Sequence, residues 1–200
     1  MNATRRSIVT LASMIPVYSL AAKSTDGLVS EAAGDRLVLS DFGPKEEILM
    51  PGASWRGFSD RVMGGVSNAD FNREELDGRR CVRMTGDVTR DSGGGFIQMA
   101  LYLDQADASA YRGVELLVYG NDEDYNAHIR TPDCGWHDES YRATFHAEAR
   151  WQTVRISWDA FKPNGVAVPL DNSRLERLGL LGWMREFTAD LAVGEIALYS

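Results

Sequence analysis

The chain has 200 residues, of which 44% are hydrophobic and 25% charged, a composition typical of a globular protein that buries a core. Its 21 basic and 29 acidic residues give a formal net charge of −8. Nucleic acids and anionic membranes would repel such a surface, and no Lys/Arg cluster offsets the charge, so the composition excludes both as partners.

The first 21 residues have the layout of an export signal. Arg5 and Arg6 form a short basic region, an apolar run follows from Ile8 to Leu20, and small residues flank Leu20. We expect cleavage after Ala21 and a periplasmic mature chain. The paired arginines resemble a twin-arginine signal, the type that exports folded cargo. The run is too short and polar for a stable membrane span. An uncleaved leader would instead leave the protein cytoplasmic or membrane-associated.

Residues 22–36 form a polar linker, and strand patterns follow it. Apolar and polar side chains alternate over residues 36–42, 80–89, 95–103, 125–131 and 142–149. Residues 113–120 are almost all apolar, as expected of a central strand covered on both faces. Further strands are predicted at 151–158, 175–183 and 191–200, and one helical turn at 158–161. Ten or so short strands separated by turns predict an all-β domain over residues 37–200, an antiparallel β-sandwich or jelly roll.

The two cysteines, Cys81 and Cys134, do not have a metal-binding spacing. In an exported protein they could form a disulfide, which would add ~4 kcal/mol if the geometry allowed it. The sequence leaves their pairing open.

The three histidines lie close together in the chain. If residues 125–131 and 142–149 form a hairpin, His128 and His146 share a face and become cross-strand neighbours. With Glu148 nearby they could ligate a metal, but a solvated polar face is the ordinary explanation, and we predict no metal or other cofactor.

The same hairpin suggests a binding surface. Arg130, Trp136, Tyr141 and Arg142 combine flat rings with hydrogen-bond donors, a mixture that suits sugars or polar protein segments. If these four side chains lined a concave sheet face, sugar binding would be favoured, whereas a flat apolar patch would favour a protein partner. A solvated strand face with an aromatic loop is the alternative.

Enzymatic motifs are absent from the sequence. The paired carboxylates Asp122/Asp124 and Asp138/Glu139 lie in predicted turn segments, where such residues are common for conformational reasons. No nucleophile elbow, zinc-protease motif or phosphate loop is present, and the glycines at 93–95 more simply allow a turn. We therefore predict a protein that is not an enzyme, with a hydrolase as the least favoured alternative.

An ordered set of motifs runs through the predicted domain. Trp55 precedes "DRVMGGVS" at residues 60–67, "GGF" follows at 94–96, and "LLVYGNDEDY" occupies 116–125. The later blocks are Trp151, Val154, Ile156, Phe161 and Pro163, then "LGL" at 178–180 with Phe187, Leu191, Ile196 and Tyr199. This order resembles the complex I intermediate-associated protein 30 family over residues 37–200.

The resemblance implies a jelly roll similar to galactose-binding and carbohydrate-binding modules, and a non-catalytic, chaperone-like assembly factor for partly built respiratory complex I. For the "DRVMGGVS" segment it implies a rigid loop that is either structural or a partner contact. Gly64 and Gly65 would supply unusual backbone angles, and Asp60 would bind backbone amides. Met63 and Trp55 would anchor the loop to the core. The loop's candidate binding residues are Trp55, Asp60, Met63, Gly64, Gly65 and Ser67.

Two functions follow. The first is an exported assembly protein that engages a protein client through this loop and the polar hairpin face of His128, Arg130, Arg142 and His146. The alternative is an exported carbohydrate-binding module that uses Trp136, Tyr141, Arg130 and Arg142. The family's known role lies on the inner side of the membrane, so an exported member would serve another client or ligand.

Overall fold

The computed structural model describes residues 36–42 and 52–200. The expected leader at 1–21 and the linker at 22–36, apart from Arg36, lie outside the described residues. Within the described ranges, no helix has the length and apolar character needed to cross a membrane.

Twelve strands and three short 3₁₀ turns make up the described part of the chain. The strands are β1 (Arg36–Asp41), β2 (Ser54–Ser59), β3 (Asp70–Leu76), β4 (Arg79–Val88), β5 (Phe96–Ala106), β6 (Gly113–Tyr119), β7 (Glu123–Arg130), β8 (Ser140–Ala147), β9 (Gln152–Ser157), β10 (Lys162–Asn164), β11 (Leu175–Trp183) and β12 (Phe187–Tyr199). The 3₁₀ turns are η1 (Asp60–Met63), η2 (Asp91–Gly93) and η3 (Trp158–Ala160).

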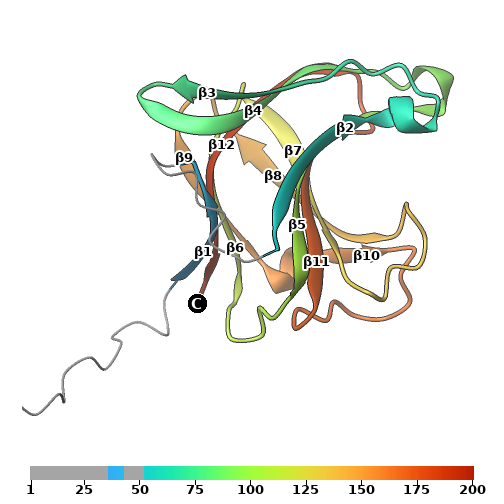
Figure 1. Ribbon diagram of the computed structural model, residues 1–200. Helices are drawn as coiled ribbons and strands as arrows, with labels where there is room; N and C mark the ends of the chain where they lie inside the picture. The colour runs from blue at the N-terminus through green and yellow to red at the C-terminus, as the bar shows by residue number, and fades with distance from the viewer. Residues whose placement is uncertain (1–35, 43–51) are drawn as a thin grey trace, which may run out of the picture. The chain divides into compact units, whose positions relative to one another are not determined.

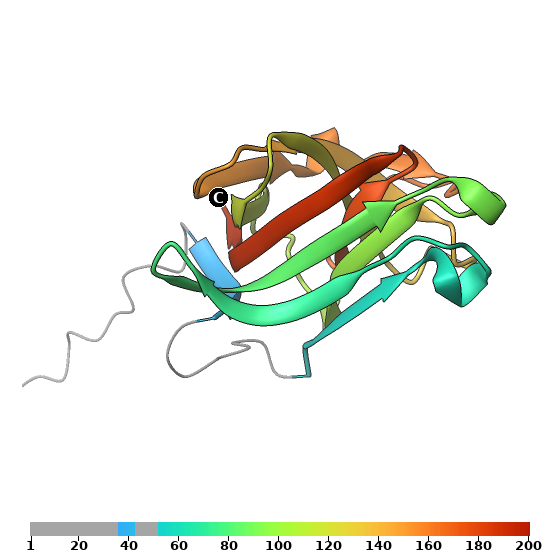
Figure 2. The same cartoon turned by 90° about the horizontal axis from the view of Figure 1, so that it is seen from above.

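The strands form two antiparallel sheets (Figure 1). Sheet A has the order β3-β4-β12-β6-β9, and β1 also pairs with β12. Sheet B has the order β10-β8-β7-β11-β5-β2. The long strand β12 pairs with β4 through its first half and with β1 through its second. In Figure 2, β12 is the red strand and β4 is the green strand beside it. The all-β sandwich predicted from the alternating patterns is confirmed.

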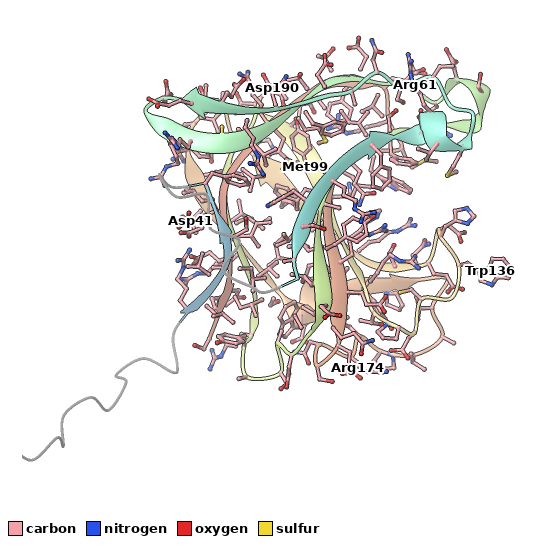
Figure 3. All side chains as sticks on the ribbon, viewed as in Figure 1. Asp41, Arg61, Met99, Trp136, Arg174 and Asp190 are labelled. Atoms are coloured by element: carbon pink, nitrogen blue, oxygen red, sulfur yellow. The ribbon has the colours of Figure 1, made fainter. Side chains whose placement is uncertain are left out.

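The core lies between the two sheets. On β7, Tyr125 and Ile129 point inward and are fully buried, and they meet residues such as Met84 and Leu116 of sheet A in one cluster. Met99 of β5, labelled in Figure 3, belongs to the same cluster. Because successive side chains of a strand alternate between faces, Asn126 and His128 lie on the outer face of sheet B, away from sheet A.

Most predicted strands are present within a few residues of their expected ends, and the helical turn at 158–161 appears as η3. Three strands were missed, β2, β3 and β10. The apolar segment 113–120 is the internal strand β6, but Leu117 and Tyr119 on its outer side are only partly buried. The expectation that both of its faces are covered is therefore wrong for part of the strand.

Candidate binding site

The "DRVMGGVS" segment is built around the buried carboxylate of Asp60. One oxygen, Oδ1, accepts a hydrogen bond from the Ser67 amide at 2.9 Å. The other, Oδ2, accepts from the Ser67 hydroxyl at 2.5 Å, the Gly95 amide at 2.6 Å and the Phe96 amide at 3.3 Å. Burial by itself raises the pKa of Asp60, but these hydrogen bonds outweigh it and the pKa lies below its ordinary value. The "DRVMGGVS" and "GGF" motifs are thus joined through one carboxylate.

Glycines make this close packing possible. Gly64 has φ +91°, a left-handed conformation that ends η1. A Cβ at Gly65 would lie 2.4 Å from Cγ of Asp60, and one at Gly94 would lie 2.3 Å from its Oδ2. The predicted hydrogen bonding of Asp60 to backbone amides is therefore correct, and Gly65 is required for space rather than for its backbone angle.

The two predicted anchors of the loop behave differently. Trp55 packs against the core, with its ring centroid 5.6 Å from that of Phe42, and its Nε1 donates to Oγ of Ser40 at 2.9 Å. Met63 is 58% exposed, so the expectation that it anchors the loop to the core is wrong. Inside the loop, Asp60 already provides the anchor, which leaves Val62 and Met63 projecting from η1.

These projecting side chains form one wall of a cleft on the outer face of sheet B. Strands β2, β5, β11, β7 and β8 contribute its floor, while η1, η2 and the β7–β8 loop surround it. Its cavity volume is about 280 Å³, at the small end of ligand sites in proteins. Arg61 and Trp136, labelled in Figure 3, mark the η1 and β7–β8 loops on this side of the sheet.

Flat side chains cross the floor of this cleft from strand to strand. The rings of Phe58 and Phe96 are 6.0 Å apart between centroids, and those of Phe96 and Trp183 are 5.8 Å apart. The imidazole of His128 follows at 4.9 Å from the Trp183 ring, and Cζ of Arg142 lies 4.7 Å from the centroid of that ring. We call Phe58, Phe96 and Trp183 the aromatic row.

Polar atoms beside the aromatic row lack partners within the described part of the chain. They are Nε2 of Gln98, Nε2 of His128 and Nε of Arg177, and all three residues line the cleft. Burial, then the charges of Arg142 and Arg177, lower the pKa of His128 to about 3, so its imidazole is neutral at physiological pH.

A glycine of β11 makes room for one of these atoms. Gly179 is the cross-strand partner of His128, and a Cβ on it would lie 2.1 Å from Nε2 of Gln98. The amide of Gln98 therefore lies over the bare backbone of Gly179. This is the glycine of the "LGL" motif, so that motif also belongs to the cleft.

The residues predicted from the β7–β8 hairpin do not converge as expected. His128 pairs with Arg142 and His146 pairs with Asp124, so the two histidines are not cross-strand neighbours. The hairpin has the predicted strands, but its register differs by several residues from the one that would oppose them. Only His128 and Arg142 reach the cleft. Nδ1 of His146 lies 3.0 Å from Oδ1 of Asp124 at an exposed position.

Three other predicted residues have structural or peripheral positions. Arg130 donates to the carbonyl oxygens of Trp136, Cys134 and Glu139, and so holds the β7–β8 loop. Trp136 itself is 70% exposed at the tip of this loop. Tyr141 is fully buried, because it has the inward parity of β8, so its proposed role on a sugar-binding face is wrong.

The sequence analysis missed most of the cleft. Phe58, Phe96, Gln98, Arg177 and Trp183 were not singled out as binding residues. One signal was present on β5, where the outward positions include Phe96 and Tyr102, although alternation predicts polar side chains there. Phe58 and Trp183 gave no comparable signal.

The sequence raised two further possibilities, a metal site at His128, His146 and Glu148 and a disulfide between Cys81 and Cys134. No group of three or more His, Cys, Asp or Glu side chains within residues 36–42 and 52–200 is placed to hold a metal ion. Cys81 and Cys134 are buried free thiols. The two cysteines therefore do not form a disulfide with each other. Cys81 is enclosed in β4 and Cys134 in the β7–β8 loop.

Known structures with a similar fold include carbohydrate-binding modules. The family 11 module of the cellulosomal cellulase Lic26A-Cel5E of Clostridium thermocellum has a TM-score of 0.68 at 16% identity, covering 84% of this chain and 96% of that one. The family 11 module from Clostridium thermocellum in complex with a β-1,3-1,4-mixed-linked tetrasaccharide has a TM-score of 0.67 at 14% identity, with 84% and 98% covered. A family 30 module of cellulase Cel9D-Cel44B, also from Clostridium thermocellum, has a TM-score of 0.54 at 15% identity, with 73% and 91% covered.

At these identities the similarity shows a shared jelly-roll fold, which hosts many functions. A search of curated protein sequences found no significant match. The family model described as complex I intermediate-associated protein 30 matches residues 41–192, and it includes the Asp60 loop, the "GGF" strand and the "LGL" strand that build the cleft. The chain belongs to the complex I intermediate-associated protein 30 family.

Proposed function

We propose that this protein is a non-catalytic assembly factor that holds a partner protein in the cleft on the outer face of sheet B. The observation that carries the proposal is the convergence at one cleft of the aromatic row with buried polar atoms that lack partners among the described residues. Side chains arranged in this way present both apolar area and unused hydrogen-bonding groups to a ligand. The family to which the chain belongs, named for its association with complex I intermediates, supports the assembly role.

The chemistry of the cleft supports binding rather than catalysis. His128 has a pKa of about 3 and would be a weak general base near neutral pH. Asp138 is the carboxylate that lines the cleft, and it is exposed on the β7–β8 loop.

The rim of the cleft favours a protein partner. Val62, Met63 and Met184 are exposed by 69%, 58% and 46% and lie on its edge. Unbranched methionine side chains adapt to different apolar shapes, a property common at protein-binding surfaces. A partner's apolar side chain would cover these residues and enter between them toward the aromatic row.

Carbohydrate binding is the second candidate, and the aromatic row is the observation that favours it. Flat rings beside hydrogen-bond donors suit the faces and hydroxyl groups of sugars. One of the similar structures contains a bound tetrasaccharide. The four residues on which the sequence-based version of this hypothesis depended do not converge, so a sugar would have to use the aromatic row instead.

Paired tryptophan variants test the proposal. Trp183→Ala removes the centre of the aromatic row, while Trp136→Ala removes an exposed ring outside the cleft. We expect a partner from envelope extracts to be retained by wild type and Trp136→Ala and lost by Trp183→Ala, as measured by quantitative mass spectrometry. Binding of glycans that depends on Trp183, without such a partner, would support the carbohydrate alternative. Retention of the partner by Trp183→Ala would contradict the proposed cleft.

We also propose that the protein acts after export, as its N-terminal sequence suggests. Replacing Arg5 and Arg6 by lysine should stop export if the twin-arginine route is used. In cell fractionation, the variant would then appear in the cytoplasmic fraction and the wild type in the periplasmic fraction. A wild-type protein found in the cytoplasm would contradict this proposal without affecting the cleft.

A further inference from the structure

The polar part of the cleft has an excess of hydrogen-bond donors. The side chains of Gln98 and His128 are among the most buried polar groups of the described chain, with 4% and 5% of each residue exposed. Nε2 of Gln98 and Nε of Arg177 can only donate, and neither has an acceptor there. A ligand that completes this part of the cleft must therefore supply acceptor oxygens, because buried donors without acceptors cost free energy.

The charge of the cleft decides which kind of acceptor is favoured. Arg142 and Arg177 line it, and neither forms an ion pair in the part of the chain that the structure describes. Arg142 stacks on Trp183 and donates to the Asp138 carbonyl at 2.8 Å and to Oγ of Ser140 at 2.9 Å, and the charge of the Asp138 side chain also acts on it. The cleft lining thus carries two guanidinium charges, those of Arg142 and Arg177, against one carboxylate, that of Asp138.

The neutral imidazole between these charges is consistent with an anion-binding site. The positive charges of Arg142 and Arg177 both reach His128 and oppose its protonation, in addition to burial. A neutral imidazole offers one N–H donor to a ligand and does not add a third positive charge. Which ring nitrogen carries the hydrogen would be set by the ligand's own acceptor.

We propose that the cleft recognises an acidic segment of the partner protein, in which an Asp or Glu carboxylate stands next to an aromatic or aliphatic side chain. The carboxylate would accept from Gln98 and Arg177, and the apolar neighbour would lie on the aromatic row. The planar guanidinium suits the two oxygens of a carboxylate. The cleft volume of about 280 Å³ accommodates one such anchor rather than a long peptide. This inference rests on the proposed function and specifies its ligand.

Two blocked dipeptides that differ only in charge provide a direct test with the wild-type protein. The probes are N-acetyl-Phe-Glu-amide and its isostere N-acetyl-Phe-Gln-amide, titrated while the indole N–H of Trp183 and the side-chain amide of Gln98 are followed by NMR. We expect saturable shifts of both signals with the Glu peptide and at least tenfold weaker binding of the Gln peptide. Added salt should weaken the former, because screening reduces the interaction of the exposed portion of the site.

Variants at two arginines of the same sheet face locate the effect. Arg177→Gln removes a charge from the cleft, whereas Arg56→Gln removes one outside it, and both guanidiniums lie near the ring of Tyr102. The preference for the Glu peptide should fall at least fivefold in Arg177→Gln and be unchanged in Arg56→Gln. The dispersion of the NMR spectrum shows whether each variant is folded, and the wild-type peptide comparison does not depend on either.

The outcomes separate this inference from the proposed function. Equal binding of the two peptides, or no binding of either, overturns the acidic-segment proposal. Binding of tri-galacturonate but of neither peptide also overturns it and identifies an acidic sugar as the ligand. If a partner protein is still captured in a Trp183-dependent manner in any of these cases, the proposed function stands and only its ligand chemistry is wrong.

Discussion

At the scale of single residues, Asp60 shows how one buried carboxylate holds a surface loop in place. Its carboxylate holds the amides of Ser67, Gly95 and Phe96, which belong to two separate chain segments. The loop therefore presents Val62 and Met63 from a fixed base. Because Phe96 is both a partner of Asp60 and a member of the aromatic row, the same contact positions the floor of the cleft.

Replacing Asp60 by asparagine should be strongly destabilising. In the variant, the NH₂ group of asparagine replaces one carboxylate oxygen. It faces N–H or O–H groups that donate to that oxygen in the wild type, and these donors lose their acceptor. We expect the free energy of unfolding to fall by about 3 kcal/mol, measured by urea denaturation at pH 7. The control is Asp70→Asn at an exposed position of β3. A loss below about 1 kcal/mol would show that the carboxylate charge is dispensable.

The lowered pKa of Asp60 gives this prediction a pH dependence. A carboxyl group whose folded-state pKa is lowered stabilises the fold fully above its unfolded pKa, near 3.8, and loses this contribution as pH falls through the folded value. The difference between wild type and Asp60→Asn should therefore shrink below pH 4. A difference that grows in acid would contradict the assigned direction.

The buried imidazole of His128 predicts a second loss of folding stability at low pH. Its folded pKa of about 3 lies below the ordinary value of 6.5, so the unfolded chain binds the proton first as pH falls. Between pH 7 and pH 4 this should cost about 3 kcal/mol of unfolding free energy in the wild type. In His128→Gln the added slope should disappear, whereas His146→Gln, at an exposed imidazole, should keep it. Equal slopes in wild type and His128→Gln would contradict the neutral, buried imidazole.

At the scale of elements, strand register places the cleft. The pairing of Trp183 with Phe96 and of His128 with both Gly179 and Arg142 aligns outward side chains across β5, β11, β7 and β8. A slip of one residue would turn each of these side chains toward the core. The buried inward set of β7 and β11, which includes Tyr125, Ile129, Leu178 and Leu180, prevents such a slip.

Two glycines in strands test how register and the site are linked. A Cβ added at Gly179 would lie 2.1 Å from Nε2 of Gln98, at the end of a flexible side chain. A Cβ added at Gly113 would lie 2.1 Å from the backbone oxygen of Ile156, which cannot move as easily. Gly179→Ala should displace the amide, weaken binding at the cleft at least tenfold and lower stability by about 1 kcal/mol. Gly113→Ala should disturb the β6–β9 pairing and cost about 3 kcal/mol. Thermal unfolding and peptide titration measure both effects, and a larger stability loss for Gly179→Ala would contradict this assignment.

There are physical reasons why three strands were not predicted from the sequence. β3 is an edge strand of sheet A, and its mostly exposed polar residues give only a weak alternation. β10 contains three residues, too few for a pattern. β2 immediately precedes the "DRVMGGVS" segment, and its Gly57 interrupts the alternation. The ring of Phe71 packs where a Cβ on Gly57 would be, 2.3 Å from the Phe71 Cγ.

At the scale of the molecule, the stability of the described sandwich comes from its core rather than from a covalent bond between its two cysteines. The buried cluster includes side chains from both sheets, and the two thiols are free. Burial, with the nearby charge of Glu74, raises the pKa of Cys81 to about 11. Such a thiol is a poor nucleophile at neutral pH.

We therefore expect the melting temperature to be the same with and without a reducing agent. In the native protein, a thiol reagent should modify Cys81 and Cys134 slowly, at a rate limited by opening of the structure. Unfolding in denaturant should then expose two reactive thiols. A mass lower by two hydrogens in the purified protein, or a melting temperature that falls on reduction, would show that the cysteines pair.

The sequence by itself determined the class of the fold, most of its strands and the inward or outward parity of many side chains, because alternation is a local property of most strands. The order of its motifs also sufficed to indicate the family. Among the residues it singled out, His128 and Arg142 line the cleft, and Asp60 makes the predicted hydrogen bonds to backbone amides.

Only the tertiary structure decided which outward residues meet. Phe58, Phe96, Trp183 and His128 come from four strands, and their contact depends on strand order and register. The same dependence separated His128 from His146 and brought Gln98 over Gly179. Pairings between distant segments are selected by burial of the whole core, whose free energy is shared among all strands, so no local pattern encodes the row of side chains that forms the cleft.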